Sequence, residues 1–443
     1  MTLPIGPVAE ASGWGRYPLT HSRSAAMISA LEARLPVGDD TVLPHGRGRS
    51  YGDVALNDGG VLLATRSMDR FIDFDPHTGR LRCEAGMTID ELLRVTVKRG
   101  WFLPVTPGTR WASIGGCVAN DVHGKNHHRA GSFGNHVLRL ALLRSDRGRV
   151  VCDWETEPAL MRATVGGLGL TGLILWVELQ LKPIVGAAMD VEAERFHTLD
   201  QFLELSRSAD RDWEYTVAWI DCLSARQDRL AGVFHRGRHT DTAAPDPQAP
   251  SDLPAVPFPL PVSAVNAASL RIFNRLYLAR APATPQLTRQ HYQTYFYPLD
   301  RIPEWNRLYG KRGFVQHQCV VPASAHAAMR TIFAEITAAG EGSMLAVLKV
   351  FGEVPSRGLL SFPRPGLTLA LDFPIRGPST FALLERLDAI VVDAGGAVYP
   401  AKDARMSART FAAGFPAAAE LESFRDPRFE SSFWRRVHGG GNR

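Results

Sequence analysis

A glycine-rich run with two arginines offers the first recognisable chemistry in this sequence. Glycine has no Cβ, so a loop rich in it can turn backbone N–H groups toward an anion. Guanidinium groups beside such a loop bind phosphate oxygens through paired hydrogen bonds. The run therefore predicts a pyrophosphate cradle, and a basic surface loop is the alternative interpretation of these letters alone. The residues of this loop are Gly46, Arg47, Gly48, Arg49, Ser50, Tyr51, Gly52 and Asp53.

A second candidate segment, Pro104–Val137, combines glycine turns with a high density of polar side chains. Its Ser113-Ile114-Gly115-Gly116 stretch offers backbone donors to a phosphate or a ring edge. Gly131 and Gly134 permit the close approach of a planar group. Structural glycines alone would not need so many donor side chains beside them, so we expect this segment to contact a cofactor.

Two lysines stand out in the C-terminal third. Lys349 lies within the apolar run Leu345–Phe351, where a lysine is costly to bury unless a partner or an anion lies beside it. Lys402 follows the strand-like Gly396–Tyr399 and precedes Asp403, for which a surface ion pair is the simpler interpretation.

One glycine motif and one histidine cluster fail as sites because of their context. GLGLTG (Gly167–Gly172) has the spacing of a dinucleotide fingerprint, which requires a strand before it and a helix after it. Here the expected order is reversed, with helix Glu157–Thr164 before the motif and a strand after it. The adjacent His127 and His128 cannot both face one ion from a strand, and no carboxylate or cysteine stands at ligand spacing. No metal is therefore expected.

Composition restricts the class of protein. The 443 residues carry a net charge of +5 and are 45% hydrophobic, as in globular chains of about two to three domains. The sequence has no apolar run of about 18 residues, no secretory signal pattern and no paired cysteine spacing, so we expect a cytoplasmic protein. The cations are dispersed. They give no support to nucleic acid as a partner, and they fit either a phosphorylated substrate or an anionic membrane face.

The elements that must position these groups follow an α+β pattern up to about residue 186. Short strands alternate irregularly with helices, unlike the regular alternation of a parallel sheet. Thr88, just ahead of Asp90 and Glu91, is the expected N-cap of one helix. The expected strands are Thr41–Pro44, Val61–Ala64, Phe71–Asp75, Arg80–Glu84, Leu138–Ser145, Val150–Asp153 and Gly172–Lys182, and the helices are Ser24–Leu35, Thr88–Arg99 and Glu157–Thr164.

From about residue 187 the sequence predicts longer strands and two amphipathic helices. Gln316 and Gln318 share one strand face, which is consistent with one shared cavity. His239–Val262 holds seven prolines from Pro245 to Pro261, so it is expected to be a mobile lid or a linker between subdomains. The expected strands are Glu214–Asp221, Phe314–Val321, Met344–Phe351 and Thr368–Pro374, and the helices are Ala325–Ala339 and Thr380–Ala394.

Seven motifs resemble one known family along almost the whole chain: GRGRSYGD, PGTR, SIGG, HGKNHHRAGSFGNHV, ATVGGLGLTG, LDFPI and YPAKDAR. They are similar to the decaprenylphosphoryl-β-D-ribose 2′-oxidase family, within the vanillyl-alcohol-oxidase (PCMH-type) FAD superfamily. The resemblance implies a two-part FAD-binding domain, residues 1–186 and 397–443. A substrate domain based on an antiparallel β-sheet, residues 187–396, is inserted between the parts.

The resemblance also implies roles for individual residues. Many superfamily relatives bind flavin covalently through a histidine where this chain has Arg49, so the FAD is expected to be non-covalent. Besides residues 46–53, the cofactor-binding residues implied are Gly108, Ser113, Ile114, Gly115, Gly116, Asn120, Asp121, Val122, His123, Ile174 and Tyr399. Lys402, His123 and Tyr51 are implied to be catalytic, and the substrate-binding residues are Lys125, Trp219, Phe296, Gln316, Lys349, Thr368 and Ala370.

Three positions depart from the family pattern. Ala370 replaces a cysteine, Thr368 an asparagine and Phe296 a pocket tyrosine. Thiol-directed covalent inhibition is therefore expected to be lost, and the sugar or lipid-phosphate end of the pocket is expected to differ.

The implied reaction oxidises the 2′-hydroxyl of a polyprenylphosphoryl-β-D-ribofuranose to the 2′-keto sugar. The implied partners are a quinone or other electron acceptor and a separate NAD(P)H-dependent keto-sugar reductase that completes epimerisation to the arabinose form. Peripheral association with the inner face of the membrane is compatible with this substrate. The catalytic base is not identified.

Two rival functions remain open on the sequence. An FAD-dependent sugar-alcohol or aldonolactone oxidase of the same superfamily would act on a free soluble sugar. A non-enzymatic FAD-binding or sensory protein would bind the flavin without a sugar substrate.

Overall fold

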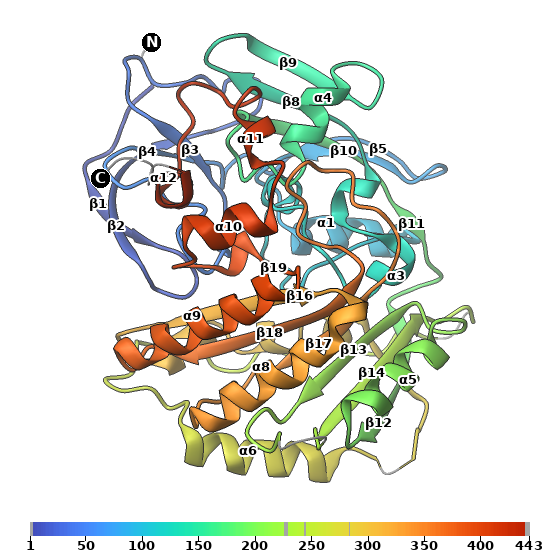
Figure 1. Cartoon of the computed structure of the whole chain (residues 1–443). Coiled ribbons are helices and arrows are strands. Elements are labelled where there is room, and N and C mark those ends of the chain that lie inside the picture. Colours follow the sequence, from blue (N-terminus) through green and yellow to red (C-terminus); the bar gives the residue numbers. More distant parts are fainter. Residues whose placement is uncertain (1–2, 226–228, 243–244, 283, 439–443) are drawn as a thin grey trace.

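Three larger β-sheets and one two-stranded sheet organise the described part of the chain (Figure 1). The computed structural model describes residues 3–225, 229–242, 245–282 and 284–438. The first sheet has the order β1-β2-β4-β3, in which β2, β4 and β3 are parallel and β1 is antiparallel to β2. Its strands are β1 (Ala9–Ser12), β2 (Leu19–Ala26), β4 (Val61–Ala64) and β3 (Val42–His45).

The second sheet is antiparallel and has the order β5-β6-β10-β8-β9. Its strands are β5 (Phe71–Asp75), β6 (Arg80–Glu84), β10 (Leu173–Gln180), β8 (Val137–Arg144) and β9 (Gly148–Asp153). The apolar side chains of β6, β8 and β10 share one buried cluster with those of α1 (Ile89–Thr96) and α2 (Ile114–Ala119). β7 (Trp101–Phe102) and β11 (Lys182–Pro183) form a separate short pair.

The third sheet has eight antiparallel strands in the order β15-β12-β14-β13-β17-β18-β16-β19. Helices α5 (Leu199–Ala209), α8 (His326–Ala338) and α9 (Pro378–Asp393) pack against one face and bury an apolar cluster there (Figure 1). The strands are β15 (Thr288–His291), β12 (Ala188–Phe196), β14 (Gly232–His239), β13 (Tyr215–Ile220), β17 (Val347–Phe351), β18 (Gly366–Pro374), β16 (Phe314–Val321) and β19 (Ala397–Val398).

The opposite face of this sheet is more polar, and the strand register decides which residues it presents. Gln316 pairs with Asp372 and Gln318 pairs with Ala370, while Lys349 pairs with Thr368 on the other side of β18. Because paired residues point to the same face and the side-chain period is two, these six positions share one face with Trp219 of β13, which pairs with Val347. The predicted sharing of a face by the two glutamines is confirmed.

The C-terminal segment returns to the first sheet after β19. It contains α10 (Ala408–Gly414), α11 (Ala418–Leu421) and α12 (Ser432–His438). The Val42 N–H donates to the Arg428 carbonyl at 2.8 Å, and Arg436 forms an ion pair with Asp53 at 2.7 Å. β19 itself belongs to the eight-stranded sheet, so a domain boundary at residue 396 would fall inside that sheet. The domain limits stay a prediction.

Several expected elements are confirmed and one is wrong. The Thr88 capping box, α4 (Pro158–Thr164) before GLGLTG and β10 after it are as expected. The helix predicted over Ser24–Leu35 is wrong, because β2 runs to Ala26 and pairs in parallel with β4. Pairing with β4 overrides the helix propensity of Ala25 and Ala26, and residues 27–35 form neither a helix nor a strand.

The Pro-rich segment is bound to a neighbouring segment. The N–H groups of Leu253, Val256 and Leu260 donate to the carbonyls of Arg301, Pro303 and Arg307 at 2.6–3.2 Å. Within its described residues, 240–242 and 245–262 form no helix or strand, as expected. A helix that was not predicted, α6 (Ala267–Arg280), follows it, with Asn266 as N-cap.

Candidate active site

The glycine-rich loop 46–53 follows β3 and packs against two other segments. A Cβ on Gly46 would overlap Ser113 Oγ, and a Cβ on Gly52 would overlap the backbone carbonyl of Asp403. Gly48 has a φ of +61°, a conformation that favours glycine. The Tyr51 N–H donates to the Ala401 carbonyl at 3.1 Å. The loop therefore brings Ser113, Tyr51 and the residues next to Lys402 together.

The side chains of the loop have different partners. Arg47 forms an ion pair with Glu91 at 3.3 Å, and the Arg49 guanidinium stacks on Trp14, 4.0 Å from its ring centroid. Asp53 is buried and bound by Arg436 through two hydrogen bonds of 2.7 and 3.0 Å. Asp53 thus fixes the loop to α12, and its carboxylate is already in use.

The second segment presents fewer free backbone donors than the sequence led us to expect. The N–H groups of Ile114 and Gly115 donate to the carbonyls of Met87 and Ala85 at 2.8 and 2.7 Å. The Gly116 N–H donates to Ser113 Oγ at 3.3 Å, which caps α2. The prediction of free N–H donors is wrong for these three residues.

Polar residues 120–126 divide into structural and site-facing groups. Asp121 is fully buried and accepts hydrogen bonds from the Gly134 N–H, Ser132 and Ser361. Asn120 donates to the Gly116 carbonyl, and its own carbonyl accepts from Tyr399 Oη at 2.8 Å. The buried Oδ1 of Asn120 has no hydrogen-bond partner among the described residues.

His123 stands at the centre of a polar cluster between the loop and the eight-stranded sheet. Its Nδ1 lies 3.0 Å from Lys349 Nζ, and its Nε2 lies 2.8 Å from the Gln318 amide. The Gln318 amide also donates to Thr368 Oγ1 at 3.2 Å. Burial, and then the Lys349 ammonium, hold the pKa of His123 well below its ordinary value, so the ring is neutral at pH 7.

A second group lies around Lys402. The Lys402 Nζ is 4.0 Å from the ring centroid of Tyr51, and Gln316 donates to the Asp372 carboxylate. The backbone N–H of Asp372 donates to Ser343 Oγ at 2.8 Å. The Asp372 Oδ2 and Gln316 Oε1 atoms are buried and have no partner among the described residues.

Burial sets the charge states of this group. It raises the pKa of Asp372 to about 7 and lowers the pKa of Lys402 to about 8, while the Asp372 carboxylate acts against the second shift. Burial also keeps the pKa of Tyr51 well above its ordinary value. A carboxyl and an amine that titrate near neutral pH within one cluster are a typical arrangement for proton transfer.

Sequence reasoning missed Asp372. The signal was present, because Asp372 follows Thr368 and Ala370 at two-residue spacing on one strand and must share their face.

Two further lysines extend the positive charge of the cluster. Lys349 donates to the Gly124 carbonyl at 3.1 Å, and Lys125 donates to the Tyr295 carbonyl. The pKa of each lysine is lowered to about 7, by burial in both cases and, for Lys349, also by the charges of Lys125 and Lys402. Three neighbouring ammonium groups with lowered pKa values are suited to binding an anion such as phosphate.

The remaining predicted residues differ in how close they lie to these groups. Trp219 lies on the same sheet face, where its ring is 4.6 Å from that of Tyr277 in α6. Phe296 is only 2% exposed and packs between Phe102 and Tyr215, so the structure places it in a hydrophobic core. The Lys125 Nζ lies 5.5 Å from its ring centroid. Ile174 is likewise buried in the core of the second sheet.

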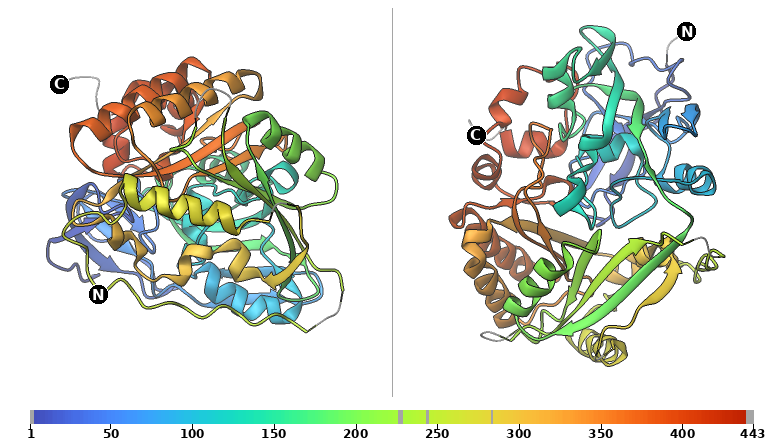
Figure 2. Two further views of the ribbon diagram at one scale, coloured as in Figure 1. Left: turned by 90° about the horizontal axis from the view of Figure 1, so that it is seen from below. Right: turned by 90° about the vertical axis from the view of Figure 1, so that its right-hand side faces the viewer.

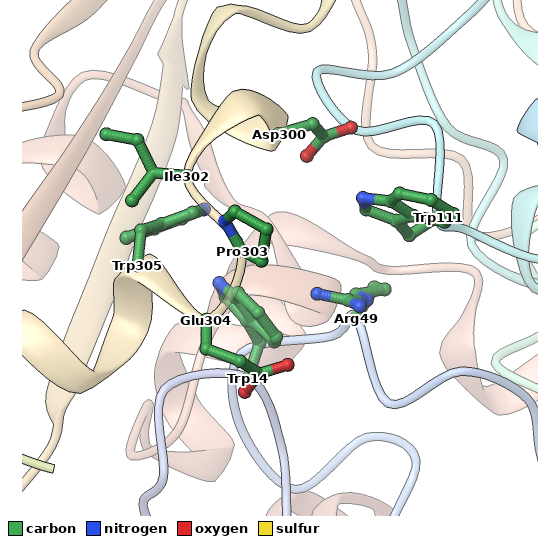
Figure 3. Close-up of a pocket in the computed structure, with 8 residues that line it drawn as sticks. All are labelled: Trp14, Arg49, Trp111, Asp300, Ile302, Pro303, Glu304 and Trp305. Atoms are coloured by element: carbon green, nitrogen blue, oxygen red, sulfur yellow. The ribbon is translucent and has the colours of Figure 1, made fainter. Parts of the chain in front are cut away.

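A hollow of about 230 Å³ lies beside Arg49, lined by three indole rings and two carboxylates (Figure 3). Trp14, Trp111 and Trp305 come from three distant parts of the chain, and none of them was predicted. Burial raises the pKa of Asp300 in this wall to about 6. The remaining wall residues are Ile302, Pro303 and Glu304.

Comparison with known proteins now assigns a family. The model of an FAD binding domain matches residues 23–152. Decaprenylphosphoryl-beta-D-ribose oxidase of Mycolicibacterium smegmatis is 33% identical over 450 aligned residues, covering 96% of this chain and 96% of that protein. The chain belongs to the decaprenylphosphoryl-β-D-ribose oxidase family.

Other relatives match less of the chain. An uncharacterised protein in the mprA 5′ region of Streptomyces coelicolor is 34% identical and covers 77% of this chain and 95% of that protein. D-2-hydroxyglutarate dehydrogenase of Escherichia coli is 30% identical over 32% of this chain and 14% of that protein. As a member of the ribose oxidase family the chain is an FAD-binding oxidoreductase with an α+β fold, and these predictions are confirmed.

The residues of the cradle fit FAD. Gly46 and Gly52 let loop 46–53 pack directly against Ser113 and Asp403, and Asn120 Oδ1 is a buried acceptor without a partner among the described residues. The Arg49 Nε is also buried without such a partner. Loop 46–53, Ser113 and Asn120 would therefore hold the cofactor in this family member.

The exposed Gly108 provides a test of this assignment. A Cβ at this position would meet no atom of the protein within 4 Å, so Gly108→Ala should leave the fold intact. We expect the variant to keep its thermal stability and to lose FAD affinity by about tenfold or more, because the Cβ would meet the cofactor. Flavin content after gel filtration measures this. Gly6→Ala, with ordinary contacts at 3.5 Å, is the control, and full FAD retention in Gly108→Ala would contradict the assignment.

Proposed function

We propose that this chain oxidises the 2′-hydroxyl of a polyprenylphosphoryl-β-D-ribofuranose to the 2′-keto sugar, the first half of epimerisation to the arabinofuranose donor. The observation that carries this proposal is the cluster of Lys125, Lys349 and Lys402, which offers positive charge for a phosphate beside a buried acid that can take a proton. A free sugar or sugar alcohol carries no negative charge for these lysines to bind.

The residues of the cluster divide into two roles. Lys125 and Lys349 bind the phosphate, and His123 orients Lys349 through the 3.0 Å contact with its Nζ. Lys402 and Tyr51 hold the 2′-hydroxyl, whose proton passes to Asp372 Oδ2. FAD held by loop 46–53 would supply the oxidation, as the acceptor of the hydride from C2′. Arg49 in place of a tethering histidine supports non-covalent attachment of the flavin.

Several parts of the proposal concern partners. A quinone or another acceptor would take up the electrons removed from the substrate, and a separate NAD(P)H-dependent reductase would reduce the keto sugar. No helix among the described residues has the length and apolar character to cross a bilayer. We propose peripheral attachment to the inner face of the membrane, where such a substrate resides.

Anaerobic flavin bleaching tests the substrate class. A polyprenylphosphoryl ribose should bleach the flavin of the purified holoenzyme, whereas ribitol or an aldonolactone should not. Bleaching by the free sugars alone would replace this proposal with the sugar-alcohol or aldonolactone oxidase. A flavin that no sugar bleaches would favour a non-enzymatic FAD-binding protein.

Phosphate binding should depend on pH with a definite sign. Because the pKa values of Lys125 and Lys349 are about 7 in the free protein, a bound phosphate raises them and binding takes up protons. The Kd of a polyprenyl phosphate should therefore rise with pH above about 7, approaching about tenfold per pH unit for each proton taken up. Titration calorimetry in buffers of different ionisation enthalpy measures this uptake. Lys125→Gln should flatten the profile, and a flat profile in the unmodified protein would argue against a phosphate site.

A further inference from the structure

Helix α6 carries apolar side chains on its outward face. Ile272 is 62% exposed, Leu276 53% and Phe273 39%, although such side chains are usually buried in helices of this length. The preceding Pro-rich segment adds Phe258 at 60% and Val262 at 78% exposure. Figure 2 (left) shows this segment and α6 on the side of the molecule that faces the viewer. Five exposed apolar side chains thus lie within one stretch of the chain, residues 258–276.

The same helix is strongly cationic. Between Asp252 and Asp300 the sequence contains no aspartate or glutamate, and it contains four arginines. Arg271, Arg275 and Arg280 belong to α6, are exposed, and form no ion pair with any residue that the structure describes. A surface helix whose exposed face carries apolar and arginine side chains and no acidic residue is complementary to a negatively charged lipid surface.

The inward face of α6 contacts the candidate active site. Tyr277 packs on Trp219, and its hydroxyl lies 3.0 Å from His235 Nε2 of β14. Leu270 is buried in a cluster that also contains Tyr51. One helix therefore has an apolar, cationic outer face and an inner face directed toward the residues proposed to bind the substrate.

We propose that α6, with Phe258 and Val262 of the preceding segment, docks onto a bilayer that contains anionic lipids. This inference rests on the proposed function, since a polyprenylphosphoryl sugar is held in a membrane by its isoprenoid chain. Ile272, Phe273 and Leu276 insert at the level of the head groups, and Arg271, Arg275 and Arg280 bind lipid phosphates. The docked helix would bring Trp219, on which Tyr277 of α6 packs, close to the lipid surface.

Vesicle flotation of the holoenzyme tests the docking. We expect the protein to float with phosphatidylcholine vesicles that contain about 30% phosphatidylglycerol, and to remain unbound with phosphatidylcholine alone or in about 0.5 M salt. Ile272→Ser combined with Leu276→Ser, and separately Arg271→Gln combined with Arg275→Gln, should each lower the bound fraction about tenfold or more. The control combines Leu31→Ser with Val37→Ser, which are 88% and 78% exposed and lie far along the chain from α6, and it should bind normally.

Three results would overturn the inference: no binding of the unmodified protein to anionic vesicles, full binding of both α6 variants, or a dimer that Ile272→Ser with Leu276→Ser converts to monomers. Flavin bleaching by a short, water-soluble farnesylphosphoryl ribose separates this inference from the proposed function. All α6 variants should be bleached at the normal rate by this substrate, but slowly by substrate presented in vesicles. If the soluble substrate fails with the unmodified protein, the proposed function falls and vesicle binding stands as a separate result.

Discussion

Lys402→Met is expected to lower kcat/KM for flavin reduction by about 10²–10⁴-fold without unfolding the protein. Methionine keeps the length of the side chain and its contact with the Tyr51 ring, which lies 4.0 Å from the ammonium. The substitution removes the positive charge that we propose binds the substrate hydroxyl. Stopped-flow reduction with a polyprenylphosphoryl ribose measures the effect.

A matched variant separates this effect from a general loss of charge. Lys98→Met removes an exposed lysine near the end of α1 and should leave the rate unchanged. A rate near that of the unmodified enzyme for Lys402→Met would exclude Lys402 as a catalytic residue. A changed flavin absorption spectrum without a slower reduction would indicate that Lys402 contacts the cofactor alone.

Asp372→Asn is expected to reduce kcat/KM by about 10²-fold or more, because Asn cannot accept the hydroxyl proton. It should also move the alkaline limb of the pH profile. The Asp372 carboxylate raises the pKa of Lys402 against the effect of burial, so its removal lowers that pKa below about 8. A rate that needs the Lys402 cation will then fall at a lower pH than in the unmodified enzyme. Asp73→Asn on the exposed strand β5 is the control.

Thermal stability distinguishes a catalytic role of Asp372 from a structural one. Burial raises the pKa of Asp372 to about 7 in the folded chain, above its value in the unfolded chain. The carboxyl therefore favours folding only while it is protonated, and this contribution is lost as the pH rises through about 7. Asn can still accept the hydrogen bond from Gln316, so Tm at pH 8 should be equal or higher in Asp372→Asn. A large fall in Tm with unchanged kinetics would show that the residue is structural.

Much of the site could be predicted because its signals are local. Close packing of loop 46–53 requires glycine, and the glycines of GRGRSYGD lie close together in the sequence, where a motif search finds them. The shared face of Gln316 and Gln318 follows from the two-residue period of a strand. Lys349 was identified because burying a lysine within an apolar run is costly unless a polar partner or an anion lies beside it.

The features that were missed depend on contacts between distant segments. The N–H groups of Ile114 and Gly115 are used by carbonyls near residue 86, which no pattern within 113–116 could reveal. Ser24–Leu35 has helical composition, but its first three residues belong to β2 and pair with β4. Asp372 gains its importance from Lys402, which lies thirty positions away in sequence and next to it only in the fold. Phe296 matched a pocket position by motif, although its ring is packed in the core.

α6 was missed for a different reason. Its outward apolar residues do not follow the usual pattern of a helix with a single buried stripe, and it directly follows a Pro-rich stretch. Only the exposed fractions in the folded chain reveal that it has two different faces.

The most direct test of the central claim is flavin reduction by a polyprenylphosphoryl ribose that carries deuterium at C2′. If the 2′-hydroxyl is oxidised, the substrate with deuterium at C2′ should bleach the flavin more slowly than the substrate with hydrogen at C2′. The 2′-deoxy analogue should bind without bleaching the flavin. Equal rates for the two isotopologues, together with bleaching by the 2′-deoxy analogue, would contradict 2′-oxidation by this enzyme.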